Sequence, residues 1–257
     1  MINDKVVFIG GVGGSGTRVV AQIVNALGIP LGSNLNGAFD NLDWPAPQIA
    51  PLLRDRTRSY EDKFTEMSSA FISFANKMDA DSPNATGTDF AWGTKVPGSF
   101  FYLRYLSELF ENVRYIHIVR HGLDMAYSKN HNQLFNWGGY FNIVLEDGAT
   151  PRHLLKYWAC ANSHALENCR AWLPNQHLVI KFEDLCSNRL AHVHQIASFL
   201  GLRDVDAAAD EISMKIKKQK SQGRYKKLAQ PDMFDASDIS VLEQLGYTVD
   251  WTGDLSN

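Results

Sequence analysis

The stretch that most constrains this chain lies near its N-terminus, where residues 6–20 read VVFIGGVGGSGTRVV. A β-branched and aromatic run leads into a glycine-rich segment, and Thr17 then opens a segment with apolar residues at helical spacing. A strand, a tight loop and a helix in this order aim backbone N–H groups and the positive end of a helix dipole at one point. We therefore expect an anion site, most often a phosphate site, at residues 13–17.

The loop departs from the Walker pattern of ATP- and GTP-dependent enzymes. That pattern places a lysine directly after the last glycine, where it reaches the β- and γ-phosphates. Here Gly16 lies five residues after Gly11, but Thr17 and Arg18 follow it, and the loop holds no lysine. Glycine-rich turns also occur without a ligand, so a plain strand-to-helix turn is the alternative to an anion site.

Length and composition limit the classes of protein that the chain can belong to. Its 257 residues fit one domain over residues 1–257, and a net charge of −3 argues against bulk affinity for nucleic acid or membranes. We expect no membrane span, because no run of eighteen apolar residues occurs. The N-terminus lacks a signal-peptide layout, and three cysteines without metal-ligand spacing fit a reducing cytoplasm.

Short apolar strands alternate with longer helical patterns along the chain. This alternation predicts a three-layer, P-loop-like α/β fold, with a mostly parallel central sheet and helices on both faces. A polar segment at residues 31–58 is expected to be a loop that folds back over the anion site, and residues 79–89 a surface loop. After the first strand, strands are expected at 90–95, 113–119 and 177–181, and helices at 17–27, 60–79, 99–111, 123–131, 151–172, 188–200, 207–218 and 238–245.

Polar groups follow three of the expected strands, namely the glycine loop, Lys95 and Arg120. Ligands of parallel sheets bind outside the carboxyl ends of the strands. Ser128 lies eight residues after Arg120, on the helix expected next, so that both side chains can face one ligand. Arginine suits a phosphate because its planar fork makes two parallel hydrogen bonds. The alternative is an Arg120–Asp124 salt bridge with Ser128 facing solvent.

Four segments in order carry a resemblance to a known family. They are Gly14-Ser15-Gly16-Thr17, the stretch from Val119-Arg120 to Ser128, Phe182-Glu183-Asp184-Leu185 followed by Phe199-Leu200-Gly201, and Gly223-Arg224. Each segment is a weak signal alone. In this order, over nearly the whole chain, they resemble the sulfotransferases that use 3′-phosphoadenosine 5′-phosphosulfate (PAPS).

The resemblance implies roles for these residues. The main chain of Gly13, Gly14, Ser15, Gly16 and Thr17 would hold the 5′-phosphosulfate of PAPS. Arg120 and Ser128 would hold its 3′-phosphate, and Arg224 would close over the nucleotide from a late loop. The reaction would be in-line transfer of a sulfuryl group to a hydroxyl or amine of a small-molecule or carbohydrate acceptor. The product would be adenosine 3′,5′-bisphosphate (PAP), and no metal is expected.

The glycine loop differs from the family pattern at one position. Many family members carry a lysine or arginine directly before the Ser-Gly-Thr triplet, where this chain has Gly14. Sulfuryl transfer needs alignment and donors for charge on the leaving phosphate. We hypothesise that Lys95, before Pro97 at a strand end, and Arg18 share this task and also contact the donor. The alternative for Lys95 is a solvated lysine.

A general base must take the proton of the acceptor. We favour Asp40, because Asn36 and Asn41 lie close enough in the sequence to orient it. Asp43 is the second choice, and both aspartates fit ordinary turns equally well. Among the histidines, we expect His117 in the core, His121 near the nucleotide, and His131 on a helix face, exposed or toward the acceptor.

The aromatic residues 135–141 are expected to be either a wall of the acceptor site or an apolar cluster under a loop. The sequence leaves carbohydrate, phenol, lipid and peptide hydroxyls open as acceptors. Two other functions are compatible with the pattern. One is a P-loop phosphotransferase that uses nucleoside triphosphates, which the missing loop lysine disfavours. The other is a non-catalytic nucleotide-binding module, which Gly14 favours.

Overall fold

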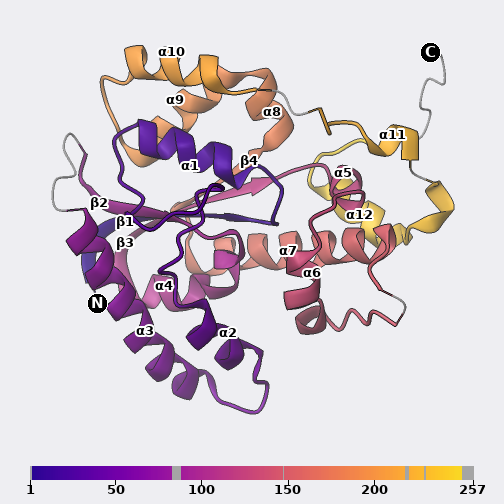
Figure 1. Ribbon diagram of the computed structural model, residues 1–257, viewed down its shortest axis with the longest axis horizontal. Helices are drawn as coiled ribbons and strands as arrows, with labels where there is room; N and C mark the ends of the chain where they lie inside the picture. The colour runs from indigo at the N-terminus through magenta and orange to yellow at the C-terminus, as the bar shows by residue number, and fades with distance from the viewer. Residues whose placement is uncertain (1, 83–87, 147, 218–219, 229, 251–257) are drawn as a thin grey trace.

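A four-stranded parallel sheet forms the centre of the computed structural model, which describes residues 2–82, 88–146, 148–217, 220–228 and 230–250 (Figure 1). Its strands are β1 (Ile2–Gly11), β2 (Phe90–Lys95), β3 (Phe110–Val119) and β4 (His177–Lys181), in the order β2-β1-β3-β4. Every neighbouring pair is parallel. The carboxyl ends of all four strands therefore lie at one edge.

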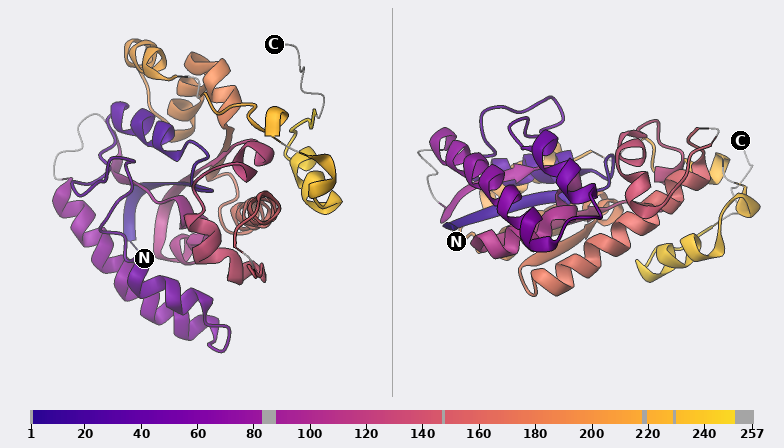
Figure 2. Two further views of the ribbon diagram at one scale, coloured as in Figure 1. Left: turned by 45° about the vertical axis from the view of Figure 1, so that its right-hand side comes forward. Right: turned by 90° about the horizontal axis from the view of Figure 1, so that it is seen from below.

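Helices cover both faces of the sheet, which confirms the predicted three-layer α/β fold (Figures 1 and 2). Side chains alternate along β1, so that Val6 and Phe8 enter one core while Val7 and Ile9 enter the other. The first core is covered by α2 (Ala46–Arg54), α3 (Tyr60–Asp81), α4 (Leu103–Leu109) and α7 (Pro151–Trp172). The second is covered by α1 (Thr17–Ala26), α9 (Arg189–Leu200) and α10 (Asp206–Lys215). Burial on both faces explains the continuous apolar strands.

Local capping signals set several helix ends. The hydroxyl of Ser59 accepts a hydrogen bond from the Asp62 amide at the start of α3. Thr150 and His153 form a capping box before α7, whose first residue is Pro151. At the other end of a helix, Gly201 adopts φ 72° and closes α9.

Two predicted element boundaries are wrong near the middle of the chain. The loop predicted over residues 31–58 contains helix α2. Pro45 is the N-cap residue of this helix, and Pro47 lies in its first turn, where proline is tolerated. The helix predicted over 99–111 is a 3₁₀ helix, η1 (Pro97–Tyr102), followed by the short α4. Phe110 already belongs to β3, since its ring packs edge-on against Phe8 and Trp92. Packing in the core thus overrode helical periodicity.

The helix predicted over 123–131 is also wrong. Helix α5 (Gly122–Ala126) ends early, and α6 (Asn132–Trp137) and the 3₁₀ helix η2 (Gly138–Phe141) follow. Ser128 Oγ accepts from the Asn130 amide, and Asn130 Oδ1 accepts from the Asn132 amide. These side-chain bonds compete with helix formation. Ser128 therefore lies in a turn after α5 and not on a helix.

The C-terminal third contains more helix boundaries than the sequence predicted. A short α8 (Phe182–Ser187) precedes α9, and α10 ends at Lys215. Residues 83–87, within the predicted surface loop, and Lys218, the predicted end of α10, lie outside the described residues. The chain then forms α11 (Tyr225–Leu228), η3 (Pro231–Met233) and α12 (Ala236–Gln244).

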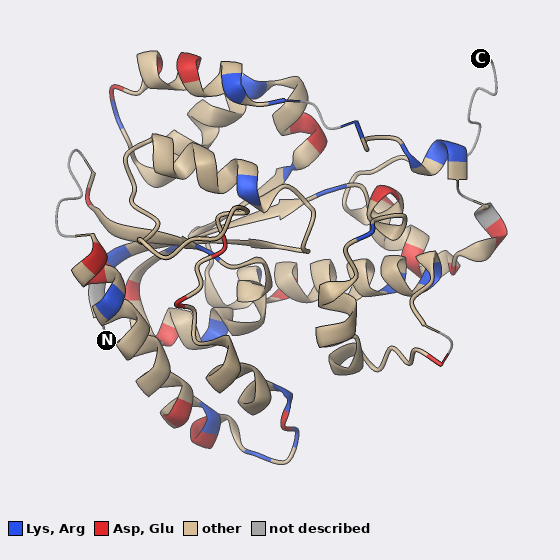
Figure 3. Cartoon of the chain, viewed as in Figure 1, with Lys and Arg blue, Asp and Glu red and all other residues tan. Residues whose placement is uncertain are grey.

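Charges of both signs are spread over the helices, and basic residues gather from the end of α10 to α11 (Figure 3). Among the described helices, none is both long enough and apolar enough to cross a bilayer.

Candidate functional site

The glycine loop turns sharply between the end of β1 and the first turn of α1. The Ser15 amide donates to the Val12 carbonyl at 2.9 Å, and the buried Ser15 hydroxyl donates to the same oxygen. Gly14 and Gly16 adopt φ 98° and 106°, which side chains disfavour, and a Cβ on Gly16 would lie 2.3 Å from the Phe182 ring. Within the described residues, the amides of Gly14, Gly16 and Thr17 make no hydrogen bond. The loop therefore offers donors at a helix N-terminus.

Arg120 extends from the end of β3 toward this loop. Its Nη1 donates to the Gly14 carbonyl at 3.4 Å, and its Nη2 donates to the Ser221 hydroxyl at 2.8 Å. The side chain is 5% exposed, and its Nε is buried without a hydrogen-bond partner. Burial lowers the pKa of the Arg120 guanidinium. Arg120 forms no ion pair with Asp124, so a buried cation with a free donor lies beside the glycine loop.

Asp124 has a structural role that the sequence analysis missed. Its buried carboxylate accepts from the Gly223 amide at 2.8 Å and from the Tyr225 amide at 3.3 Å. These bonds hold the late loop against α5, and Arg224 between them donates to the Tyr127 carbonyl at 3.1 Å. An acid four residues after Arg120, within the motif, was the signal in the sequence that could have indicated this role.

The predicted anion ligands converge around the loop. Ser128 Oγ lies 3.9 Å from the position that a Cβ on Gly14 would occupy. Arg224 is held beside Ser128 through Tyr127, and its charge contributes to the lowered pKa of Arg120. Arg120 and Ser128, which are eight residues apart, and Arg224 from the late loop thus lie on one side of the glycine loop.

The Phe-Glu-Asp-Leu segment lies against the same loop. The Phe182 ring packs on Gly16, and the Arg120 guanidinium carbon lies 5.2 Å from the centre of this ring. Glu183 Oε1 accepts from the His121 amide at 3.0 Å, which ties α8 to the end of β3. The segments of the sequence resemblance are therefore neighbours in space.

A cavity of about 280 Å³ lies over these groups. Ser15, Ser128 and Arg224 do not line it: the Ser15 hydroxyl is bonded within the loop, Ser128 to Asn130, and Arg224 to the Tyr127 carbonyl. Its lining residues come from the strand ends, α1 and the loop after α1: Gly13, Gly14, Gly16, Thr17, Arg18, Val19, Ala38, Asp40, Lys95, Pro97, Arg120, Asn130 and Phe182.

Lys95 and Asp40 form an ion pair in this cavity. Lys95 is 2% exposed, so the alternative of a solvated lysine is wrong. Burial lowers the pKa of Lys95, and the bond to Asp40 opposes this shift. Asn36 Nδ2 donates to Asp40 Oδ2 at 2.9 Å, and Asn36 Oδ1 accepts from the Asp40 amide. The segment after α1 thus folds back over the glycine loop, with Arg18 exposed at the cavity.

The other proposed bases lie in different surroundings. Asp43 pairs with Lys77 at 3.3 Å and lines neither this cavity nor the one next to it. His117 is fully buried between the Tyr115 hydroxyl and Asn162, and burial lowers its pKa to about 4.

The remaining two histidines bond to nearby main chain. His131 Nε2 contacts the Ser128 carbonyl at 2.9 Å. His121 turns away from the glycine loop, stacks on Tyr225 and contacts the Thr248 carbonyl at 3.2 Å, so it does not line the cavity.

Residues 6–206 match a family model described as the sulfotransferase family. The chain belongs to the sulfotransferase family. A comparison with curated proteins finds no match.

Solved sulfotransferase structures share the fold of this family member. A sulfotransferase domain from the curacin biosynthetic pathway is 14% identical, with a TM-score of 0.61 over 97% of this chain and 100% of that one. A sulfotransferase domain from the Synechococcus PCC 7002 olefin synthase is 17% identical, with a TM-score of 0.63 over 97% and 98%. A sulfotransferase from Mycobacterium tuberculosis H37Rv is 13% identical, with a TM-score of 0.52 over 84% and 72%. At these identities the likeness concerns the fold.

This sulfotransferase family member has a second cavity, of about 270 Å³, next to the first. The two cavities share Gly13, Asp40, Pro97 and Asn130. Eight further residues, three of them aromatic, complete the second cavity, which we call the aromatic cavity: Trp44, Ala46, Val96, Gly98, Tyr102, Asn132, Gln133 and Trp137.

The aromatic segment 135–141 divides between its two predicted arrangements. Trp137 lines the aromatic cavity, whereas Tyr140 and Phe141 pack with Phe101 and His164 in an apolar cluster. Phe135 is 61% exposed and belongs to neither.

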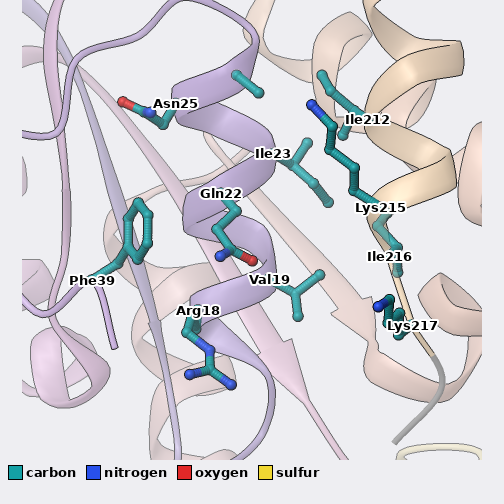
Figure 4. Close-up of a pocket in the computed structure, with 11 residues that line it drawn as sticks. Arg18, Val19, Gln22, Ile23, Asn25, Phe39, Ile212, Lys215, Ile216 and Lys217 are labelled. Carbon is teal, nitrogen blue, oxygen red and sulfur yellow. The ribbon is translucent and has the colours of Figure 1, made fainter. Parts of the chain in front are cut away.

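A third cavity, of about 430 Å³, continues from the glycine loop along α1. It shares Arg18 and Val19 with the first cavity. Figure 4 shows Val19 and Ile23 of α1 facing Ile212 and Ile216 across it. A cavity with these apolar side chains, and with polar residues such as Gln22 and Lys215, therefore adjoins the glycine loop.

Proposed function

We propose that this sulfotransferase family member transfers the sulfuryl group of PAPS to a hydroxyl or amine of a small-molecule or carbohydrate acceptor by in-line displacement. One observation carries the proposal. A buried arginine with a free Nε contacts a glycine loop in which the amides of Gly14, Gly16 and Thr17 are free. Two groups of anion ligands thus lie side by side, as a nucleotide with separate 5′ and 3′ anionic groups requires.

The residues present fit PAPS. The amides of Gly14, Gly16 and Thr17 would bind the 5′-phosphosulfate at the N-terminus of α1. Arg120 would bind the 3′-phosphate through Nε and Nη, with Ser128 and Arg224 beside it. The adenine ring would lie in the cavity along α1, between Val19 and Ile216 (Figure 4). PAPS supplies the activated sulfuryl group, and PAP is the product.

Lys95 and Arg18 would supply the charge that the loop lacks. Gly14 has φ 98°, a conformation that lysine rarely adopts, so a cation must reach the loop from elsewhere. Lys95 comes from the end of β2 and Arg18 from the first turn of α1, and both line the cavity with Gly14. In a buried site such cations stabilise charge on the leaving phosphate more than in water.

Asp40 would act as the general base. Asp40 lines both the first cavity, over the glycine loop, and the aromatic cavity. Asn36 and Lys95 hold its carboxylate from two sides. An acceptor hydroxyl in the aromatic cavity would transfer its proton to Asp40 as the sulfuryl group moves to the oxygen. Asp43 lacks this position.

Two measurements test the proposal. Calorimetry should show that the protein binds PAP more tightly than ATP with magnesium, whereas the reverse would favour a phosphotransferase. Transfer of label from ³⁵S-PAPS to a panel of hydroxylated acceptors should then be observed. Binding of PAP without transfer to any acceptor would indicate a non-catalytic nucleotide-binding module.

A further inference from the structure

We infer that the segment after α12, residues 246–250, holds Arg120 and Arg224 in the arrangement that binds the 3′-phosphate, with Tyr247 as its positioning residue. We call this segment the arm. The inference rests on the proposed binding of PAPS and deepens it, because it names a part of the chain that sets the selectivity of the donor site. The arm lies outside residues 6–206, which match the family model. Its role is argued from its contacts with the residues that follow the two arginines.

Each of the two arginines is followed directly by a ring, and these two rings stack on each other. His121 comes after Arg120, just past the end of β3, and Tyr225 comes after Arg224, at the start of α11. The ring centres are 4.6 Å apart, and the ring planes differ by 16°. Because each ring is one peptide unit away from its arginine, the stack links the backbone positions of Arg120 and Arg224.

The arm contacts both members of this stack. His121 Nε2 contacts the Thr248 carbonyl at 3.2 Å, and the Tyr247 ring packs edge-on against the His121 ring, with centres 5.0 Å apart. At the other ring, the Asp250 amide donates to the Tyr225 hydroxyl at 3.5 Å. The arm therefore joins the end of β3 to the late loop on the side of the stack away from the glycine loop.

Tyr247 also fixes the backbone next to Arg120. Its hydroxyl donates to Glu183 Oε2 at 3.0 Å, and Glu183 Oε1 accepts from the His121 amide at 3.0 Å. One carboxylate thus joins the arm to the peptide unit that follows Arg120. Hydrogen bonds to an ionised group are stronger than neutral ones, and Tyr247 is 7% exposed, so water competes little for this bond.

Two lysines hold the ends of the arm. Lys181 Nζ donates to the Gly246 carbonyl at 2.8 Å and lies 4.9 Å from the centre of the Tyr247 ring. At the other end, Lys226 pairs with Asp250 at 2.9 Å. A cavity of about 360 Å³ is lined by both the arm and the late loop. Polar contacts therefore contribute much of the attachment of the arm, since close packing does not fill the space between the two segments.

The contacts of the arm oppose a repulsion within the 3′-phosphate site. Burial, and then the charge of Arg224, lower the pKa of the Arg120 guanidinium, so two like charges face each other before a nucleotide binds. This repulsion favours movement of the late loop away from the end of β3. An arm that holds both segments in place lowers the cost of ordering the site when the 3′-phosphate binds. A nucleotide without a 3′-phosphate gains nothing from this arrangement.

Two point variants of the full chain test the inference. Tyr247→Phe keeps the buried ring and removes the bond to Glu183, and Lys181→Met removes the bond to the Gly246 carbonyl. Calorimetry compares PAP with adenosine 5′-monophosphate, which lacks the 3′-phosphate. We expect each variant to weaken PAP by about three- to tenfold, as for one hydrogen bond, and to leave the affinity for adenosine 5′-monophosphate unchanged. The KM for PAPS should rise by the same factor, with kcat at saturating PAPS unchanged.

Tyr105→Phe is the matched control, because Tyr105 is also buried but lies on α4 and lines neither the first cavity nor the aromatic cavity. It should leave both affinities unchanged. A loss confined to PAP is not expected of a variant that only destabilises the fold, since this weakens both nucleotides. Equal losses for the two nucleotides, or unchanged PAP affinity in Tyr247→Phe and Lys181→Met, would overturn the inference alone. Absence of PAP binding by the unaltered protein would refute the proposed use of PAPS and the inference with it.

Discussion

Replacing Lys95 by methionine is the most informative perturbation of the proposed chemistry. Lys95 is a buried cation at the meeting point of β2, the glycine loop and Asp40. Loss of one such transition-state donor typically lowers kcat by about 10²–10³-fold. Because exposed Arg18 lines the same cavity and shares the proposed task, we expect the lower end, about 10²-fold, for Lys95→Met.

The same change should leave the fold intact. An apolar side chain of similar length avoids the cost of burying the ammonium group, and Asp40, which is one-third exposed, regains water. We expect the free energy of unfolding to change by no more than about 1 kcal/mol, since the change removes the buried charge and leaves no unpaired charge buried. Asp40→Asn should destabilise more, by about 3 kcal/mol, the lower end of the cost of leaving a buried charge without its partner.

The pH dependence of stability follows from the lowered pKa of Lys95. The unfolded chain keeps the lysine proton up to about pH 10.5, whereas burial makes the folded chain release it earlier. The unfolded state therefore binds more protons in this window, and the free energy of unfolding rises as the pH approaches 10.5. The rise should be steeper in Asp40→Asn and absent in Lys95→Met.

The assay combines kcat at saturating PAPS, PAP affinity by calorimetry and urea unfolding. Lys77→Met is the matched control, because Lys77 also pairs with an aspartate of this segment, Asp43, but is half exposed and outside the cavity. Near-normal turnover of Lys95→Met at saturating PAPS would refute the assignment of Lys95. An equal loss in Lys77→Met would show a general effect of removing charge.

Three further outcomes are expected. Asp40→Asn should lower turnover by about 10²–10⁴-fold with PAP affinity unchanged, and Asp43→Asn should not; the opposite order in a ³⁵S transfer assay would move the base to Asp43. Arg120→Met should weaken PAP by about 10²-fold but spare adenosine 5′-monophosphate, which lacks the 3′-phosphate; calorimetry showing equal losses would contradict this role of Arg120. The pKa of His117 is about 4 in the folded chain and 6.5 in the unfolded chain. As the pH falls from 6.5 to 5, His117 therefore takes up a proton chiefly in the unfolded chain. Stability should drop by about 2 kcal/mol between pH 8 and 5, and urea unfolding of His117→Gln should show a smaller drop unless other groups cause it.

The sequence by itself determined the architecture and the edge of the sheet where the candidate site lies. Apolar strands that alternate with amphipathic helices specify a parallel sheet covered on both faces, because each element must bury its own apolar side. The glycine loop, Lys95 and Arg120 each follow a strand directly. A parallel sheet brings the carboxyl ends of its strands to one edge, so the order of these residues after the strands is enough to predict that they lie together.

Only the tertiary structure decided which side chains meet. Asp40 and Lys95 are 55 residues apart, and Asp124 holds amides about 100 residues away. The turn at Ser128 and the start of β3 at Phe110 depend on local side-chain bonds and on core packing that compete with periodicity. Periodicity records which face an element buries, whereas pairing across the fold depends on the path of the whole chain.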